Sequence, residues 1–191
     1  WKEYVPKALT FDNGTLWMKA KGRTPADGRL LLTTAEDKNY ETQVEINIGN
    51  GNTGGLVLFY NENAYAGVVS DGKKFIVYQN ASKQLELPNE LGKRFIAKIH
   101  NQGNNLSIMV SKDSKEWITL AENVDVSQMH HNNYHGFYAL RIGLLSAGKG
   151  RAGFKQFRYK NAVPQEKDMS AYLMVFHLSL IHISEPTRPI S

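Results

Sequence analysis

Short apolar segments separated by turn residues run along most of the chain. Residues 40–48 show the clearest pattern, because every second residue from Tyr40 to Ile48 is apolar or threonine and the residues between them are polar. A period of two predicts a β-strand with one buried and one solvent-facing side. Residues 56–60 are apolar throughout, as in a central strand. Asp71-Gly72, between strands expected at 65–70 and 74–79, predicts a hairpin with a two-residue turn.

The same pattern continues on both sides of this region, with roughly eleven or twelve strands in all. Further strands are expected at residues 16–20, 30–34, 95–100, 106–111, 117–120, 138–145 and 154–159. The Gly- and Asn-rich run 49–55 is expected to form a turn, and residues 127–131 are the best candidate for a helical turn. Because no crossover helices are present, parallel βαβ units are excluded. The sequence predicts an all-β protein, a two-sheet antiparallel β-sandwich or jelly roll.

No linker divides the chain, so a single domain is expected over residues 1–168. Residues 178–188 can be encoded by a nucleotide string that resembles a transposase-type sequencing adapter. We therefore interpret residues 178–191 as an adapter-derived tail and leave residues 169–177 unassigned. The chain begins with Trp1 and shows no signal peptide, so we expect the native N-terminus upstream.

Composition and charge indicate which classes of partner are not expected. The net charge is +5, but the cations are spread along the chain, with Lys73-Lys74 and Lys93-Arg94 as the densest points, so nucleic acid is not expected as a partner. No run reaches the roughly 18 apolar residues of a membrane span, so no membrane partner is expected. There is no cysteine, which excludes disulfides and thiolate metal sites. The compartment stays open, with a periplasmic or secreted bacterial location favoured over the cytoplasm.

Two groups of polar residues were considered as candidate sites. Glu41 and Glu45 share a strand, but residues four apart on a strand lie roughly 13 Å from each other. A glycosidase pair needs roughly 5–10 Å across a cleft, so a solvent-facing strand side is the better interpretation. The three histidines of residues 130–135 match no zinc spacing and have no adjacent acid. We expect no metal and no cofactor there, and favour a polar surface loop; the alternative is one imidazole that contacts a ligand or a neighbouring domain.

Aromatic residues divide into two sets by their place in the pattern. Those in strand segments are expected in the core: Trp17, Phe59, Tyr60, Phe75, Trp117, Phe154 and Phe157. Those at ends or in loops are candidates for a sugar-binding surface: Trp1, Tyr4, Tyr65, Tyr134, Phe137 and Tyr138.

Several motifs occur in a fixed order between residues 15 and 160. They are Tyr40-Glu41, the run Gly54-Gly55-Leu56-Val57-Leu58-Phe59-Tyr60-Asn61, Tyr65-Ala66-Gly67-Val68, Leu106-Ser107 leading to Trp117, and Gly143-Leu144 leading through Gly148, Gly150 and Ala152 to Phe154, Phe157 and Tyr159. In this order and spacing the sequence resembles the C-terminal concanavalin A-like domain of family 43 glycoside hydrolases, the β-xylosidase and α-L-arabinofuranosidase group.

The resemblance implies a concanavalin A-like jelly roll that is not catalytic as an isolated chain. In that family the catalytic acids lie on an N-terminal five-bladed propeller, and none of it is in this chain. The expected partners are that propeller and carbohydrate, in an enzyme that acts on xylan or arabinan side chains or on xylo-oligosaccharides. Some members place an aromatic residue of the sandwich at the rim of the sugar pocket. By position, Phe137 is the first candidate for it and Tyr134 the second, with Tyr138 and His131 as neighbours.

Two other functions remain open at this point. An independent carbohydrate-binding module needs a groove or platform with exposed aromatic rings. A complete sandwich-fold lyase or hydrolase needs acids, or Tyr, His and Arg, that converge in one cleft, and the sequence shows no pattern for this.

Overall fold

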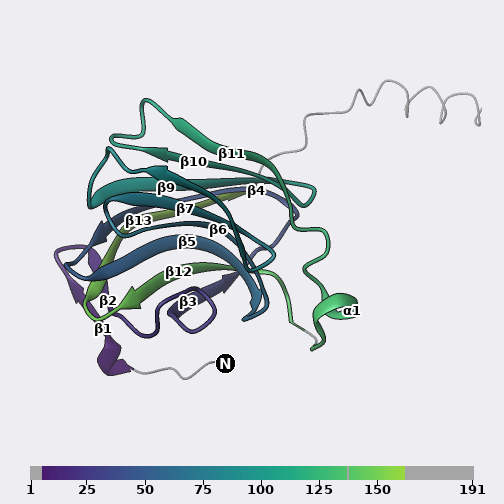
Figure 1. The fold of residues 1–191 in the computed structure, drawn as a ribbon, viewed down its shortest axis with the longest axis horizontal. Coiled ribbons are helices and arrows are strands. Elements are labelled where there is room, and N and C mark those ends of the chain that lie inside the picture. The colour runs from purple at the N-terminus through teal and green to yellow at the C-terminus, as the bar shows by residue number, and fades with distance from the viewer. Residues whose placement is uncertain (1–5, 137, 162–191) are drawn as a thin grey trace, which may run out of the picture.

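A computed structural model describes residues 6–136 and 138–161. Two antiparallel sheets lie face to face, which confirms the β-sandwich predicted from the sequence (Figure 1). The first sheet has seven strands in the order β1 (Leu9–Asp12), β2 (Thr15–Lys19), β13 (Arg151–Asn161), β4 (Asn39–Ile48), β9 (Arg94–Gln102), β10 (Asn105–Ser111) and β11 (Ile118–Asp125). The second has six, in the order β3 (Arg29–Thr34), β12 (Arg141–Gly148), β5 (Asn52–Asn61), β6 (Ala64–Ser70), β7 (Lys74–Gln79) and β8 (Ser82–Pro88). Two short helices, η1 (Pro6–Ala8) and α1 (His131–Tyr134), complete the described elements.

The two last strands do not join the edges of the sheets. Strand β12 pairs with β3 and β5, and β13 pairs with β2 and β4, so each lies between strands from the N-terminal part of the chain. Strands β1 and β2 are therefore connected to the rest of their sheet only through β13, and β3 only through β12. The domain was expected to extend to residue 168, but the described residues end at 161. Residues 169–177 and the tail 178–191 lie wholly outside them.

Most strand predictions are confirmed, and the misses have physical reasons. Strands β1 and β8 were not predicted; both lie at sheet edges, and most of their residues are exposed, so no buried face gives them a clear period. Residues 138–140 precede β12 rather than belonging to it, and the helical turn forms at residues 131–134 rather than 127–131. The turn between β6 and β7 has three residues, 71–73, rather than two.

The run 49–55 was expected to be a turn, but its second half belongs to β5. Gly54 faces the opposite sheet, where a Cβ atom would lie 3.0 Å from Ile46 and 3.3 Å from Ala152. Asn52 is buried and donates a hydrogen bond to Ser146 (3.1 Å), whose hydroxyl donates to the carbonyl of Met18 (2.9 Å). The glycine therefore permits close sheet contact and the Asn52 amide links β5 to β12, so neither residue marks a loop.

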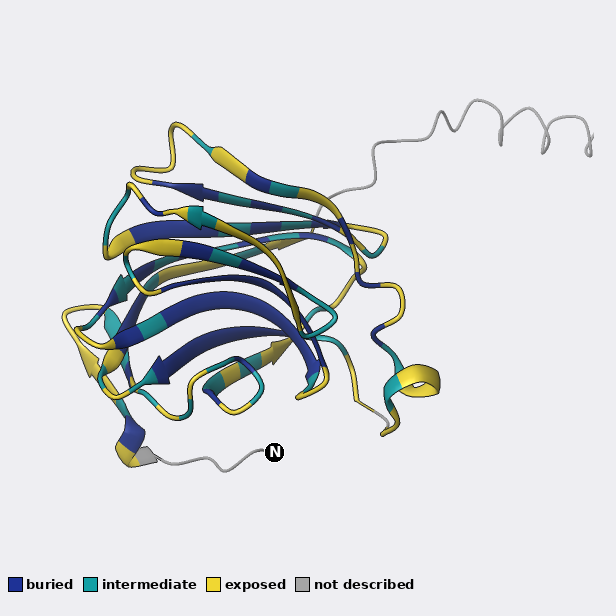
Figure 2. Cartoon of the chain, in the orientation of Figure 1, coloured by how far each residue is buried: buried dark blue, intermediate teal, exposed yellow. Residues whose placement is uncertain are grey.

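The main core fills the space between the sheets, and β4 shows how the sequence specifies it. Its buried residues alternate strictly with partly exposed ones, as the period of two predicted. Val44 and Ile46 are fully buried between the sheets. Figure 2 shows the buried residues concentrated in the central strands of both sheets.

A second apolar cluster lies on the other face of the six-stranded sheet. Its buried members are Val57, Phe59, Tyr65, Val69, Tyr78, Leu145 and Ala147. Tyr65, expected at a loop, is therefore in β6 and only 4% exposed, and burial raises its pKa to about 12. The loop of residues 20–28 covers part of this cluster through Ala26. Strand β6 is consequently buried along its whole length, which explains why its sequence lacks alternation.

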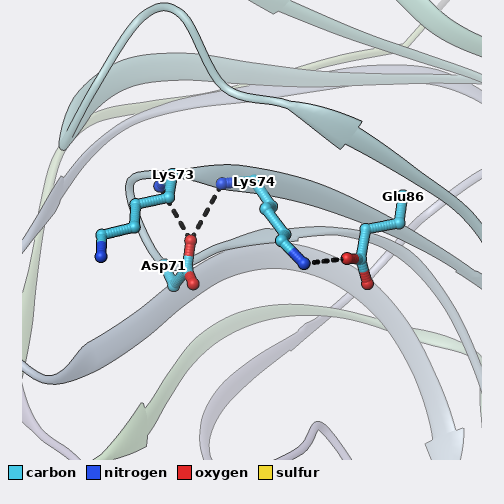
Figure 3. Close-up of polar contacts among 4 residues, drawn as sticks. All are labelled: Asp71, Lys73, Lys74 and Glu86. Carbon is cyan, nitrogen blue, oxygen red and sulfur yellow. Dashed lines mark hydrogen bonds and ion pairs between the residues drawn. The ribbon is translucent and has the colours of Figure 1, made fainter.

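The hairpin between β6 and β7 shows how an exposed turn is fixed (Figure 3). The Asp71 carboxylate accepts hydrogen bonds from the backbone N–H groups of Lys73 (2.8 Å) and Lys74 (2.9 Å). Burial alone would raise the pKa of Asp71, but these bonds outweigh it and lower the pKa below 3.8. Lys74 then forms an ion pair with Glu86 of β8, which links the turn to the edge strand.

Gly67 should be the least replaceable glycine of the six-stranded sheet. Its φ is +140°, and a Cβ atom would lie 2.5 Å from the carbonyl oxygen of Leu56. Gly67→Ala should lower the free energy of unfolding by about 3 kcal/mol or more. Gly51→Ala is the control, because φ is +67° there but no atom lies within 4 Å, so the cost should be about 1 kcal/mol. Urea unfolding followed by tryptophan fluorescence measures both, and equal losses would contradict the packing argument.

Asp27 should make the covering loop sensitive to acid. Its carboxylate accepts backbone hydrogen bonds from Arg23 (3.0 Å) and Thr24 (2.8 Å), and these lower its pKa from 3.8 to about 2. A lowered folded-state pKa stabilises the fold above pH 4, and this contribution is lost as the pH falls from about 4 to about 2. Asp27→Asn should cost less than about 1 kcal/mol at neutral pH, because solvent screens this exposed group. Its unfolding curve should converge with the wild type near pH 2; a constant difference across the pH range would refute this.

Candidate functional site

The loop between β11 and β12 carries the four residues predicted at the rim of a sugar pocket, whereas Trp1 and Tyr4, also candidates for a sugar-binding surface, lie outside the described residues. In Figure 1 it projects from one side of the sandwich and bears α1. His130 caps this helix: its backbone is extended, and its Nδ1 accepts a hydrogen bond from the N–H of Asn132 (3.3 Å). The helix ends at His135, which adopts a positive φ of 55°. His131 is exposed on the helix, with its ring 6.0 Å from that of His130, while Phe137 lies outside the described residues.

The end of β5 holds this loop against the sandwich. The single O–H of Tyr60 is shared between two carbonyls, with Gly136 (2.5 Å) closer than His135 (3.1 Å). The Asn61 side chain donates to the carbonyl of Tyr134 (3.0 Å). Three consecutive carbonyls are thus bound by two neighbouring residues of one strand, which fixes the loop where it turns back toward β12.

The structure brings two of the predicted rim residues together around Tyr60. The Tyr60 ring lies 6.5 Å from that of Tyr134 and packs edge-on against that of Tyr138 at 5.8 Å. Tyr60 is 1% exposed, Tyr134 is half-buried, and Tyr138 is 56% exposed. Gly136 leaves space for the Tyr138 ring, since a Cβ atom would lie 2.5 Å from it. The loop therefore presents one exposed aromatic ring on a buried aromatic support.

Arg141 was not predicted to take part in this loop. It donates to the carbonyl of Tyr60 (3.1 Å), and its guanidinium lies 5.6 Å from the centre of the Tyr138 ring. Its buried Nε has no hydrogen-bond partner among residues 6–136 and 138–161. A charged residue at the start of an otherwise apolar strand is the signal that sequence reasoning passed over.

The acidic residues considered for catalysis lie elsewhere, on the outer face of the seven-stranded sheet. Glu41 pairs with Lys98 (3.3 Å) and Glu45 with Arg94 (2.7 Å). Within residues 6–136 and 138–161, no three His, Asp or Glu side chains come close enough to hold a metal ion. In the same part of the chain, no helix is long and apolar enough to cross a membrane.

An apolar hollow of about 320 Å³ opens between the sheets beside β1, β3 and β13. Phe11 (77% exposed), Leu31 (37%) and Phe157 (40%) surround it, and Ile142 and Leu144 lie deeper. The expectation that Phe157 is a core residue is therefore wrong. A register shift between Lys155 and Arg158 interrupts the alternation of β13 and leaves Phe157 facing solvent.

A second hollow, of about 350 Å³, lies at the start of the chain and is basic. It is lined by Lys7, Ala8, Thr10, Trp17, Lys19, Gly150 and Arg151. Trp17 and Trp117 were expected in the core, but both are half-buried. Arg151 lies over the Trp17 ring at 4.3 Å and Lys98 over the Trp117 ring at 4.0 Å, so polar head groups cover them instead of apolar side chains.

The Tyr60 hydroxyl should be necessary for the loop geometry. Tyr60→Phe removes the donor to two carbonyls and should cost about 1–2 kcal/mol of unfolding free energy. It should also speed hydrogen exchange of the amides of residues 134–140. Tyr78→Phe is the control, because it removes the hydroxyl of another buried tyrosine (5% exposed), one whose ring packs against Tyr65 in the second apolar cluster. If both variants behave alike, the loop does not depend on Tyr60.

Comparison with known proteins places this architecture in a family. The sequence matches the family described as the β-xylosidase C-terminal concanavalin A-like domain over residues 15–160. A comparison with curated proteins gave no match. Among solved structures, the GH43 protein BlXynB from Bacillus licheniformis has a TM-score of 0.69 and 16% identity, covering 82% of this chain and 35% of that one. The Bacteroides ovatus xyloglucan PUL GH43B has a TM-score of 0.67 and 13% identity, covering 83% and 35%.

A smaller protein shares the same fold. The carbohydrate-binding module CBM66 from Bacillus subtilis has a TM-score of 0.54 and 18% identity, covering 80% of this chain and 91% of that one. At these identities the structural matches show the fold alone. The chain spans about 35% of the length of the two GH43 proteins. The family match, by contrast, covers most of the described sandwich, from β2 to β13. The chain therefore belongs to the family of β-xylosidase C-terminal concanavalin A-like domains.

Proposed function

We propose that this chain is the non-catalytic accessory domain of a family 43 glycoside hydrolase that acts on hemicellulose, and that it packs on an N-terminal five-bladed propeller. Family membership and the 35% coverage of the GH43 relatives support the proposal, because about two thirds of each relative lies outside the matched domain. One of the similar structures is described as a xylan β-1,4-xylosidase from Bacillus halodurans, which fits xylan or xylo-oligosaccharides as the substrate class.

The apolar hollow beside β1 and β3 is the observation that carries the packing proposal. Phe11, Leu31 and Phe157 are large apolar side chains exposed around one opening. Apolar patches of this kind mark interaction sites in soluble proteins. The loop with the exposed tyrosine leads directly into β12, whose Ile142 and Leu144 line the same hollow. Strand β12 thus connects the loop of the proposed rim to the apolar packing face along the chain.

The rim itself is proposed to contain Tyr138 and Tyr134, with His131 on α1 and Phe137 beyond the described residues. Tyr138 has the exposed ring that stacking on a sugar requires, and Tyr60 and Arg141 hold it in place. The hydrogen bonds from Tyr60 and Asn61 fix the loop before any partner binds. A preorganised loop reduces the entropy cost of binding a sugar at the rim.

The catalytic acids are proposed to lie on the propeller. The test is to compare this chain with the complete protein encoded by its full reading frame, using aryl xylosides and aryl arabinosides. The complete protein should release sugar and the isolated chain should not. Turnover by the purified chain would overturn the accessory role.

In the complete protein, Tyr138→Ala should lower kcat/KM for xylo-oligosaccharides roughly three- to tenfold, because it removes one stacked aromatic ring. Leu85→Ala is the control: Leu85 is a similarly exposed apolar residue (37%) on the edge strand β8 and should have no effect. Circular dichroism checks that both variants fold. Wild-type kinetics in Tyr138→Ala would remove this residue from the rim.

An independent carbohydrate-binding module is the second candidate. It is favoured by the fold shared with CBM66, because this chain covers 91% of that module. Calorimetry of the isolated chain with xylan and arabinoxylan oligosaccharides separates the two roles. Tight binding without a propeller supports the module, and absence of heat supports the accessory domain.

A further inference from the structure

The basic hollow lies between η1, β2 and the start of β13. Among its described lining residues are three cations, Lys7, Lys19 and Arg151, and no carboxylate. Trp17 forms an aromatic wall, and the Thr10 hydroxyl and the backbone at Gly150 add polar groups. Its volume of about 350 Å³ makes it a pocket for a small ligand rather than a track for a long polyanion.

Arg151 is held in a defined position within this hollow. Its guanidinium lies 4.3 Å from the centre of the Trp17 ring. The ring in turn lies across Gly153, where a Cβ atom would be 2.9 Å from two of its carbons. The absence of a side chain at Gly153 therefore leaves room for the Trp17 ring, and the ring in turn supports the Arg151 guanidinium. A stacked guanidinium still presents its N–H groups at the edge, where a carboxylate can accept two of them.

The charges around Arg151 are not balanced within the described chain. Lys19 and Arg151 are direct partners across the β2–β13 pair, where like charges destabilise a sheet. The ion pairs among the described residues join Lys74 to Glu86, Arg94 to Glu45 and Lys98 to Glu41, so none of them neutralises Lys7, Lys19 or Arg151. Arg29 adds a fourth cation nearby, since its Nε donates to the carbonyl of Lys19 (2.7 Å).

We propose that this hollow binds the carboxylate of a uronic acid residue in an acidic polysaccharide. Arg151 receives the carboxylate, Lys7 and Lys19 neutralise it, and Trp17 holds the Arg151 guanidinium in position for this contact. The choice of a sugar as ligand rests on the carbohydrate role under Proposed function, but it does not depend on the propeller or on the rim tyrosines. Figure 1 shows β1 and β2 at the opposite end of the sandwich from α1, so this is a second contact, suited to holding a substituted chain.

The first test is calorimetry of the isolated chain at low ionic strength with two probes. One is a xylo-oligosaccharide that carries a single glucuronic acid, and the other is the unsubstituted oligosaccharide with the same number of xylose units. The acidic probe should bind at least about tenfold more tightly, as expected for a charge-assisted bidentate contact. Its affinity should fall as salt is added. Equal affinity for the two probes overturns the proposal.

Variants then locate the site. Arg151→Gln should weaken the acidic probe by about tenfold or more, and Arg151→Lys should recover only part of the loss, because lysine lacks the planar fork. Lys160→Gln is the matched control: it removes one charge near the other end of the same strand, where Lys160 lies opposite Glu41 of β4 in the register, and it should change affinity less than about twofold. Circular dichroism checks the fold of each variant.

Two outcomes would overturn the assignment even if the acidic probe binds. One is an equal loss in Lys160→Gln, which would mean general attraction by a basic surface. The other is equally tight binding of inorganic polyphosphate, which would mean that the hollow does not select a sugar acid. Neither affects the Tyr138→Ala experiment, which uses neutral xylo-oligosaccharides and the complete protein, so the two proposals fail separately.

Discussion

The insertion of the two C-terminal strands into the middle of both sheets is the constraint on which the rest of the structure depends. Strand β12 joins β3 to β5, and β13 joins β2 to β4. Each pairing satisfies backbone hydrogen-bonding groups of strands that would otherwise be exposed edges. It also brings apolar residues such as Ile142 and Phe154 into the core formed by the N-terminal half. The hydrophobic core and both sheets are therefore complete only when the ends of the domain meet.

The same two strands position the candidate functional surfaces. Arg141 is the first residue of β12 and reaches back to Tyr60, so the aromatic loop is fixed at the point where β12 enters its sheet. Arg151 is the first residue of β13, and its register with Lys19 creates the basic hollow. Both candidate surfaces thus use the first residue of a strand, where the sheet fixes the backbone and the side chain can still reach the surface.

Departures from regular strand geometry decide which apolar residues are exposed. The irregularity between Lys155 and Arg158 directs Phe157 outward, and the short edge strand β1 leaves Phe11 largely uncovered. By contrast, the glycine at position 153 makes room for the half-buried ring of Trp17 on the outer face of the seven-stranded sheet. Strand β13 therefore contributes to both hollows. Its register shift exposes Phe157 at the apolar hollow, and Gly153 accommodates Trp17 at the basic hollow.

The sequence alone determined the features that depend on local pattern. The alternation in residues 40–48 specified β4 and its buried face, the turn around Asp71 specified the β6–β7 hairpin, and ordered motifs over residues 15–160 indicated the family. It also placed Tyr138 among the surface aromatics, because it follows a polar run between strands, whereas Tyr134 of the same set is half-buried against the core.

Only the tertiary structure shows the features that depend on contacts between segments far apart in the sequence. A second apolar layer buries Tyr65, a register shift exposes Phe157, and partners far apart in the chain support the loop through Tyr60 and Arg141. The hollow around Arg151 combines residues from both ends of the described chain. Periodicity reports whether a residue faces a core, but strand order and register determine which residues meet, and these follow from pairing across long sequence separations.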